Sequence, residues 1–309
     1  MEEIKFTVDK EDKNIRLDKY ISKIKEDFSR NYIQKLIDDE KILVNDKIEK
    51  KSYNIQANDE ITIIIEEPKE LSLEKKEDIN LDIIYEDQDI IIINKPIGLI
   101  VHPVKGNKTD TLVNVLLAHT DKLGNINGTI RPGIVHRLDK NTSGTIVVAK
   151  SKDSLNNLLK QFKNRDTNKV YHTILKGTLP YNSGTIDAPI GRDPKNRTKM
   201  AVIKNNSKKA VTEFKVLKRF KDYTYVEVNL KTGRTHQIRV HFSHLGYPII
   251  GDKRYGSTEE LFELNYQLLH AYKLGFYHPK TKKWVEYKAN LPNKFKTILS
   301  YLENKNKEV

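Results

Sequence analysis

An aspartate that follows an arginine by two residues, Asp139 after Arg137, is the strongest candidate for chemistry in this sequence. Both lie between Gly133 and Gly144, in a stretch that passes from apolar residues into a turn-rich loop and then into an apolar run at 145–149. If the chain is extended as far as Asp139, the two side chains point to one face, so that a carboxylate and a guanidinium share one cleft. Such a cleft suits a polyanion and offers one nucleophile or base. The alternative interpretation is an ordinary turn, since Asp before Lys-Asn-Thr-Ser-Gly is typical of one.

A second candidate segment, residues 231–246, contains Arg234 and Arg239. Its apolar residues recur with the spacing of one helix face, and Gly246 suits a helix end. The pattern predicts a strand, a glycine turn that holds Arg234, and a helix with Arg239 in its first turns. There a permanently charged guanidinium can hold a carboxylate or a phosphate. The alternative is a helix face that only contacts solvent.

The sequence predicts neither a metal site nor a nucleotide cofactor. His241 and His244 have a spacing that zinc ligands use on helices, but no Asp or Glu lies in the next helical turn and the chain has no cysteine. Gly98, Gly106 and Gly191 do not compose a phosphate-binding loop or a dinucleotide fingerprint. No serine lies in a Gly-x-Ser-x-Gly motif, so an acyl-transfer triad has no support either.

The elements that position these residues are predicted to form an α+β fold with a mixed, mostly antiparallel sheet, because the strands lack regular helical crossovers. Residues 1–70 are predicted to be a small helix–helix–β domain, residues 71–80 a charged linker, and residues 81–309 the larger domain. The elements expected in the small domain are helices near 16–26 and 30–37, a strand and turn at 41–47, and a strand at 61–65. Those expected in the larger domain are a β-hairpin at 83–93, helices near 111–119 and 153–163, and strands near 146–149, 170–175, 210–216 and 223–230.

Composition restricts the class of protein. The 309 residues suffice for two domains with buried cores, and without cysteine there is no disulfide framework or thiol nucleophile. No apolar run approaches the roughly 18 residues that cross a bilayer, and the N-terminus has no apolar signal segment. We therefore expect a cytoplasmic protein that does not associate with membranes. A monomer is the default expectation, since no exposed apolar segment calls for a partner.

The formal net charge of +13 is distributed unevenly. Residues 1–70 carry 14 Lys and Arg against 18 Asp and Glu, whereas residues 71–309 carry 41 against 24. A loop from Arg192 to Lys209 alone has seven basic residues and one acidic residue. Because cations that neutralise phosphates release bound counterions, this surplus favours a nucleic acid as the partner of the larger domain.

Taken together, the motifs resemble the RluA family of pseudouridine synthases, of the ribosomal large-subunit type, over almost the whole chain. The run from His136 to Gly144 resembles the catalytic motif of that family, and the run from Gly233 to His241 resembles its later motif. Further segments in family order are Asn94-Lys95-Pro96, Val101-His102-Pro103, Lys169-Val170-Tyr171, Gly251-Asp252, Tyr255-Gly256 and Leu269-His270-Ala271. The N-terminal domain, with Arg16-Leu17-Asp18-Lys19-Tyr20, resembles an S4-type RNA-binding domain.

The resemblance implies an enzyme that isomerises specific uridines in RNA, in the first place large-subunit (23S) ribosomal RNA, to pseudouridine without a cofactor. Asp139 is then the catalytic carboxylate, as nucleophile toward the sugar or as base at C2′, and Arg239 is its ion-pair partner. The target base is flipped out of its stem and packs against Tyr171. The substrate-binding residues that the resemblance implies are Arg137, His136, Arg234, His236, Gln237, Lys95, Arg16 and Arg30.

One departure from the family concerns the S4-like domain, which is net acidic where an RNA binder is expected to be basic. A local face with Arg16, Lys19, Arg30 and Lys35 can still contact phosphates. Two other functions remain as alternatives: a non-catalytic RNA-binding or ribosome-assembly protein, and a nuclease that uses His and Asp as general acid and base.

Overall fold

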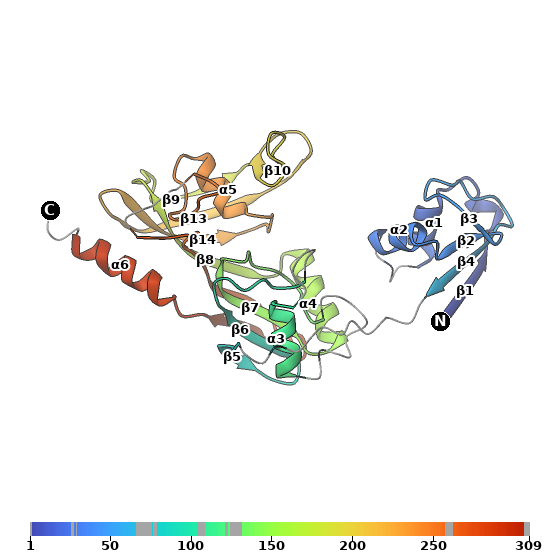
Figure 1. The fold of residues 1–309 in the computed structure, drawn as a ribbon, viewed down its shortest axis with the longest axis horizontal. Coiled ribbons are helices and arrows are strands. Elements are labelled where there is room, and N and C mark those ends of the chain that lie inside the picture. The colour runs from blue at the N-terminus through green and yellow to red at the C-terminus, as the bar shows by residue number, and fades with distance from the viewer. Residues whose placement is uncertain are drawn as a thin grey trace. The chain divides into compact units, whose positions relative to one another are not determined.

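The computed structural model divides the chain into two units, Met1–Glu70 and Leu71–Val309 (Figure 1). Each unit has its own buried core, and each is described by itself. The predicted linker, residues 71–80, lies mostly outside the described residues. Those that the structure describes are 2–25, 28, 30–65, 76, 79–103, 109–120, 123, 132–256 and 262–305.

The first unit packs two helices against a four-stranded antiparallel sheet of order β1-β4-β2-β3. The apolar spacing of α1 buries Leu17, Tyr20 and Ile21 against isoleucines of the strands. The predicted helices and the strands near 42 and 61 are confirmed, and β1 is an additional strand that pairs with β4. The elements are β1 (Glu2–Thr7), α1 (Leu17–Ile24), α2 (Arg30–Asp38), β2 (Ile42–Val44), β3 (Lys47–Ile48) and β4 (Glu60–Ile65), with a short 3-10 turn at Lys10–Asp12.

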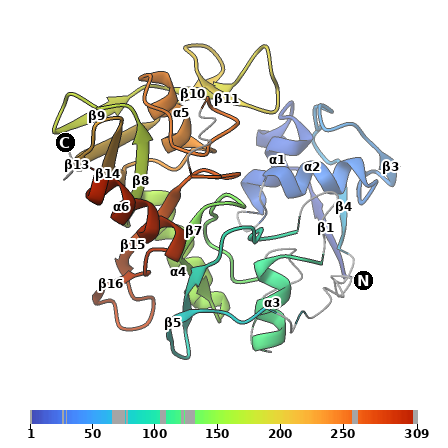
Figure 2. The same ribbon diagram turned by 60° about the vertical axis from the view of Figure 1, so that its left-hand side comes forward.

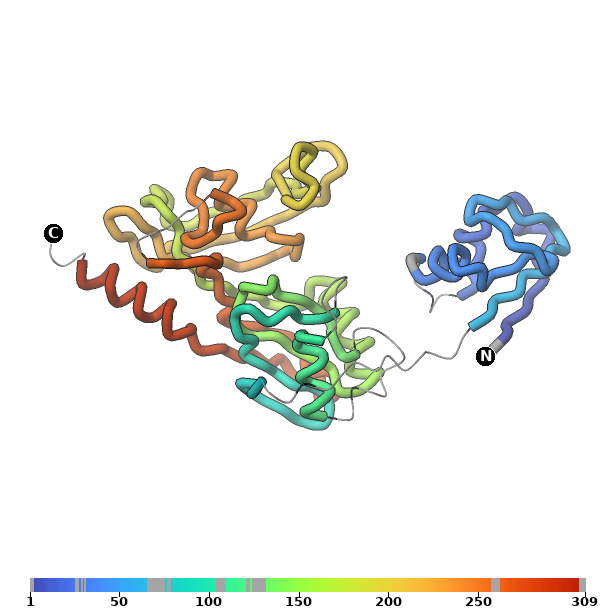
Figure 3. Tube along the Cα trace, in the orientation of Figure 1, coloured from blue at the N-terminus to red at the C-terminus, as the bar shows by residue number. Residues whose placement is uncertain are grey.

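The second unit is built on a nine-stranded sheet of order β5-β6-β7-β15-β8-β14-β13-β9, with β16 paired to β15. All its strand pairs are antiparallel except β7 with β15, so the predicted mixed, mostly antiparallel α+β fold is confirmed. The trace in Figure 3 shows the late strand β15 placed beside the much earlier strand β7. The strands are β5 (Ile83–Glu86), β6 (Ile90–Lys95), β7 (Ser143–Ala149), β8 (Asn168–Lys176), β9 (Ser183–Asp187), β13 (Val211–Arg219), β14 (Tyr223–Leu230), β15 (Leu269–Tyr277) and β16 (Trp284–Lys288).

Helices cover both faces of this sheet, which explains why its central strands are continuous apolar runs. One face packs against α3 (Leu112–His119) and α5 (Gln237–His244), and the other against α4 (Lys152–Asn164) and α6 (Asn293–Lys305). Figure 2 shows α5 and α6 on opposite sides of β8 and β14. None of the helices in the described part of the chain is long and apolar enough to cross a membrane.

A separate small sheet lies between β9 and β13 in the sequence. Its strands are β10 (Ile190–Arg192), β11 (Met200–Val202) and β12 (Ser207–Lys208), in the order β11-β10-β12. The sequence did not predict these strands, because two or three residues are too few to show an alternating pattern. The basic loop from Arg192 to Lys209 therefore belongs to an ordered ribbon.

The segment before Asp139 is not a continuous strand. β7 begins only at Ser143, and the preceding segment forms a single bridge, between Ile134 and Val148. The extended chain that would place Arg137 and Asp139 on one face is therefore absent, and the turn-rich loop expected between Gly133 and Gly144 is present. Asp139 lies in an irregular loop, and its position depends on contacts with other segments.

Candidate active site

Hydrogen bonds from two sides fix the loop that carries Asp139. The Asp139 carbonyl accepts a bond from the N–H of Thr142 (3.0 Å), so the chain turns tightly just before β7. The next carbonyl, of Lys140, accepts bonds from the N–H of Gly98 (3.0 Å) and from Nζ of Lys95 (3.1 Å). The carboxylate itself remains accessible, with 24% of the side chain exposed.

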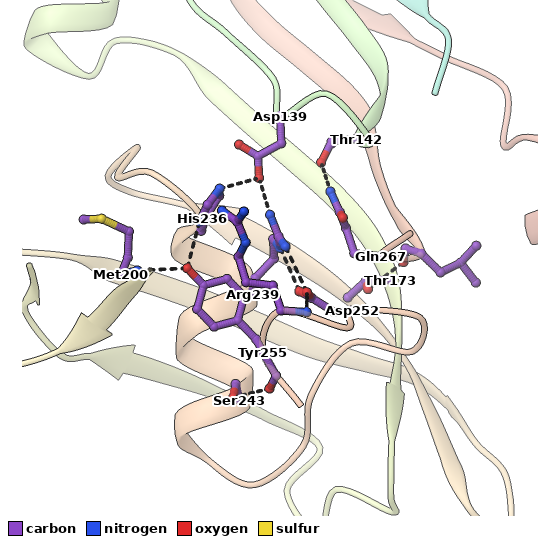
Figure 4. Close-up of polar contacts among 12 residues, drawn as sticks. Asp139, Thr142, Thr173, Met200, His236, Arg239, Ser243, Asp252, Tyr255 and Gln267 are labelled. Atoms are coloured by element: carbon purple, nitrogen blue, oxygen red, sulfur yellow. Dashed lines mark hydrogen bonds and ion pairs between the residues drawn. The ribbon is translucent and has the colours of Figure 1, made fainter. Parts of the chain in front are cut away.

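Arg239, in the first turns of α5, joins two carboxylates from different parts of the chain (Figure 4). Its Nη1 donates to Oδ2 of Asp139 at 3.1 Å. Its Nε and Nη2 donate to the two oxygens of Asp252 at 2.7 and 2.9 Å, which is a bidentate pair. Asp252 is 1% exposed and Arg239 is 7% exposed. Burial lowers the pKa of Arg239, but the hydrogen bond and charge of Asp252, followed by those of Asp139, outweigh it and raise that pKa.

His236 and Tyr255 complete the surroundings of this ion pair. The Tyr255 ring lies under the Arg239 guanidinium, 5.0 Å from ring centroid to Cζ, and its hydroxyl bonds Nδ1 of His236 at 2.7 Å. Nε2 of His236 then lies 3.8 Å from Oδ2 of Asp139. Burial lowers the pKa of His236, although the Asp139 charge opposes this effect. The imidazole therefore faces the carboxylate in its neutral form at neutral pH.

The Asp139 carboxylate faces a cavity with one apolar and one basic side. Tyr171, Leu230 and Leu269, from three adjacent or neighbouring strands, form the apolar side. Burial raises the pKa of Tyr171, and the Asp139 charge raises it further, so the phenol stays neutral. A flat, neutral ring can pack against such a surface.

The basic side of the same cavity comes from Arg137, Arg234 and Arg239. Arg137 is exposed, and Arg234 is fixed by a bond from Nε to the Lys209 carbonyl (2.9 Å). An aromatic base attached to a phosphate matches a cavity with these two sides. The structure thus brings together six predicted residues: Asp139, Arg239, Tyr171, Arg137, Arg234 and His236.

Lys95 does not face this cavity, contrary to the prediction that it binds substrate. It is fully buried, and its ammonium group donates to the carbonyls of Pro96 (2.7 Å), Leu99 (2.9 Å) and Lys140 (3.1 Å). Burial lowers the pKa of Lys95 to about 7, against the opposing charge of Asp139. All three donors are used within the protein, so Lys95 supports the loop that holds Asp139.

Gln237 borders the cavity but is only 2% exposed, and its amide is saturated. Its oxygen accepts from the Thr232 hydroxyl (2.7 Å) and the Arg234 N–H (3.0 Å), while its nitrogen donates to Val211 (3.0 Å) and Thr212 (2.9 Å). With all four positions occupied, it has no bond left for a substrate. The predicted role in substrate binding is replaced by one in fixing the turn before α5.

His136 is also engaged by the protein itself. Its Nε2 accepts a bond from the Val147 N–H (3.1 Å), and its ring stacks on Phe162 at 4.6 Å between centroids. It does not line the cavity around Asp139, but it borders the adjacent cavity together with Arg137 and Lys169. A role of His136 in binding substrate stays a prediction.

Arg16 and Arg30 lie in the first unit, where both contact the fully buried Asp18. Arg16 donates to Asp18 at 3.0 and 3.1 Å, and Nη2 of Arg30 lies 3.7 Å from it. The two side chains remain 42% and 59% exposed. The buried carboxylate thus gathers two arginines at the surface of a domain whose total charge is negative.

Sequence reasoning assigned no role to Asp252 and Tyr255, the partners of Arg239 and His236. A usable signal is Gly251, which precedes Asp252. Gly251 has φ +75°, and a Cβ there would lie 2.2 Å from the Tyr266 carbonyl oxygen. Only glycine fits this close approach, so Gly-Asp marks a carboxylate that is placed by a constrained backbone.

The half-buried His136 and the buried His270 predict how stability depends on pH. Burial, together with the charge of Lys169, lowers the pKa of His136 to about 3, and burial lowers that of His270 to about 4. Between these values and the ordinary 6.5 the unfolded chain binds protons that the folded chain does not, so stability falls as the pH drops. We expect each histidine to remove about 2 kcal/mol of unfolding free energy between pH 7 and pH 5.

Urea unfolding followed by fluorescence of Trp284, the single tryptophan, measures this in the second unit. The variant His136→Gln, whose amide oxygen can accept the Val147 bond, should lose about 2 kcal/mol less unfolding free energy than the wild type over this range. Equal urea midpoints at pH 7 and pH 5 in the wild type would contradict the prediction.

Comparison with known proteins gives a consistent result. The model of the family described as RNA pseudouridylate synthase matches residues 89–244, and that of the S4 domain matches residues 15–61. The chain is 44% identical to an uncharacterized RNA pseudouridine synthase of Bacillus subtilis over 302 residues, which are 98% of this chain and 99% of that protein. It is 41% identical to ribosomal large subunit pseudouridine synthase D of Neisseria meningitidis, over 93% of this chain and 78% of that one. Among solved structures, human RNA pseudouridylate synthase domain containing 4 superposes with a TM-score of 0.57 and 28% identity, over 72% of this chain and 92% of that one.

Proposed function

Because the chain belongs to the RNA pseudouridylate synthase family, we propose that it converts specific uridines of large-subunit ribosomal RNA to pseudouridine, with Asp139 as the catalytic carboxylate. The observation that carries this proposal is the placement of Asp139. Its carboxylate is held by Arg239 at 3.1 Å and faces a cavity with an apolar side and a basic side.

A single carboxylate is sufficient for this chemistry. The reaction breaks the bond from N1 of uracil to C1′ of ribose, rotates the base, and joins its C5 to C1′. The hydrogen of C5 leaves to solvent and N1 gains one, so atoms balance without water or a cofactor. A glycoside hydrolase needs a second carboxylate to protonate the leaving group or activate water. Here Asp139 either attacks C1′ or removes the proton at C2′.

Arg239 supports the ionised and correctly oriented form of Asp139 in either mechanism. An opposite charge at hydrogen-bond distance stabilises a carboxylate. Arg239 is itself oriented by the bidentate pair with buried Asp252, so its third donor is aimed at Asp139 before a substrate arrives. The neutral His236, 3.8 Å away, adds no second positive charge.

The remaining side chains fit a uridine that has left its stem. A base inside a duplex cannot reach Asp139, so the nucleotide must be flipped out, at a cost of a few kcal/mol. The neutral ring of Tyr171 offers a surface for the extruded uracil. The exposed Arg137 suits the vacated position or an adjoining phosphate.

The identity of the RNA rests on the relatives and on charge. Relatives that cover nearly the whole chain are named as large-subunit synthases. The S4 domain is an RNA-binding module by family, and it presents Arg16 and Arg30 at its surface around Asp18. The net positive charge of residues 71–309 adds attraction for phosphates.

Release of tritium from C5 tests the proposal, since only isomerisation expels that hydrogen. An unmodified large-subunit ribosomal RNA transcript labelled at uracil C5 is incubated with the protein, and the RNA is then analysed on a denaturing gel. We expect tritium release from intact RNA. Strand cleavage would identify a nuclease instead, and binding without release would refute this choice of RNA or the catalytic role.

A further inference from the structure

A second cavity opens beside the one that holds Asp139, and its charged lining is entirely positive. The two cavities share Arg137, Tyr171 and Arg234. We call the second cavity the cationic groove and define it by its six charged residues. These are Arg137, Lys163, Arg165, Lys169, Lys231 and Arg234.

These cations converge from four separate elements. Lys163 and Arg165 lie at the C-terminal end of α4, Lys169 lies in β8, and Lys231 and Arg234 follow β14. A helix C-terminus favours nearby cations, which accounts for the first two. It does not account for Lys169, Arg137 or Arg234, which other segments bring to the same place.

Within the described residues, five of the six cations have no carboxylate partner. Lys231 alone pairs with an acid, Glu213, at 3.1 Å. Lys150, elsewhere in this unit, has such a partner in Glu86, at 2.6 Å. A cluster of unpaired like charges is unfavourable unless an anion is present, so the groove is incomplete without one.

Lys169 is one of the two half-buried cations of this cluster, beside Arg234, whereas the other four are exposed. Nζ of Lys169 lies 5.8 Å from the centroid of the Phe162 ring. Burial lowers the pKa of Lys169, and the charge of Arg165 lowers it further. An anion bound in the groove would offset the charge of Arg165 and so raise the pKa of Lys169.

We propose that the cationic groove binds the backbone phosphate of the nucleotide next to the target uridine, with Lys169 as one of its ligands. This rests on the proposed function, because it takes the neighbouring cavity as the site of the flipped base. Successive nucleotides carry one phosphate each, and the groove begins where that cavity ends. The same strand that delivers the base therefore places its next phosphate among the cations.

Salt dependence of RNA binding tests this directly. The variant Lys163→Gln/Arg165→Gln changes two exposed residues and leaves Asp139 and its partners intact. We expect the slope of log Kd against log salt concentration to become shallower by about 0.7, the value for one single-strand phosphate contact. At a physiological salt concentration of about 0.15 M, this change of slope corresponds to a rise in Kd of about fourfold when the two lines meet at 1 M salt.

Two control variants show whether a shallower salt slope comes from the groove or only from a lower net positive charge of the protein. Lys152→Gln/Lys288→Gln removes two exposed lysines of the same unit that do not line the groove, and it should keep the wild-type slope. Lys163→Arg/Arg165→Lys should also keep it. Equal slopes in the groove variant and the wild type would overturn the proposal, as would an equal change in the Lys152/Lys288 control.

A neutral methylphosphonate linkage on either side of the modified uridine locates the phosphate. At one of the two positions, the neutral linkage should lower the affinity of the wild type for the RNA. The same linkage should not lower the affinity of the Lys163/Arg165 variant any further. Additive losses at both positions would overturn the placement. If the wild type forms no pseudouridine in any RNA, the proposed function fails, whereas the salt slopes still decide whether the groove binds a phosphate.

Discussion

Asp139→Asn is expected to lower pseudouridine formation by at least about 10³-fold while the protein still folds and binds RNA. Loss of a nucleophile or a general base from an active site costs about this much or more. Asparagine keeps the shape of the side chain and can still accept a bond from Arg239 at the observed 3.1 Å. It can neither attack C1′ nor accept the proton from C2′, so only the chemical step is lost.

Tritium release at saturating RNA measures this change, with Kd for the same transcript as the companion value. Asp193→Asn is a matched control, because this carboxylate lies in the basic loop and caps a local turn there. It should keep wild-type turnover. Turnover above about one-tenth of wild type in Asp139→Asn would exclude Asp139 as the catalytic carboxylate.

Most helices and strands were predicted from the spacing of apolar residues, because an amphipathic element repeats its apolar residues at a regular interval. The helix near 153–163 and the segment 231–246 were predicted since their apolar residues face a core at helical spacing. Strands β15 and β16 were not predicted. Five-residue β16 alternates between exposed and half-buried residues without a strong apolar pattern, and β15 pairs with β7 over more than a hundred intervening residues.

The candidate site was predicted less completely, because residue type does not show where a side chain points. Lys95 and Gln237 are polar residues in motifs that resemble those of the family's active site. Both are buried, and both form their hydrogen bonds with backbone groups or neighbouring side chains. A lysine next to a substrate and a lysine that anchors a loop look the same in sequence. Asp252 shows the converse, since its bond to Arg239 becomes visible only once the chain has folded.

Arg239→Lys is expected to lower kcat by about 10²-fold or more, with little change in the KM for RNA. The arginine uses three nitrogens at once, two toward Asp252 and one toward Asp139. A lysine has one nitrogen and cannot reproduce this fork. Losing an oriented charge at the reacting carboxylate costs about 10²- to 10³-fold in comparable sites. Single-turnover tritium release measures the loss, and Trp284 fluorescence confirms folding.

Asp252→Asn separates the charge of Arg239 from its orientation. It keeps the arginine but replaces the bidentate ion pair, so we expect a smaller loss, about tenfold in kcat. If Asp252 acts only by orienting Arg239, adding Asp252→Asn to Arg239→Lys should cost nothing further, because the lysine has no fork to orient. If the losses of kcat in the two single variants instead multiply in the double variant, Asp252 has a separate, structural role. Unchanged turnover in a folded Arg239→Lys protein would show that the reaction does not depend on the ion pair between Arg239 and Asp139.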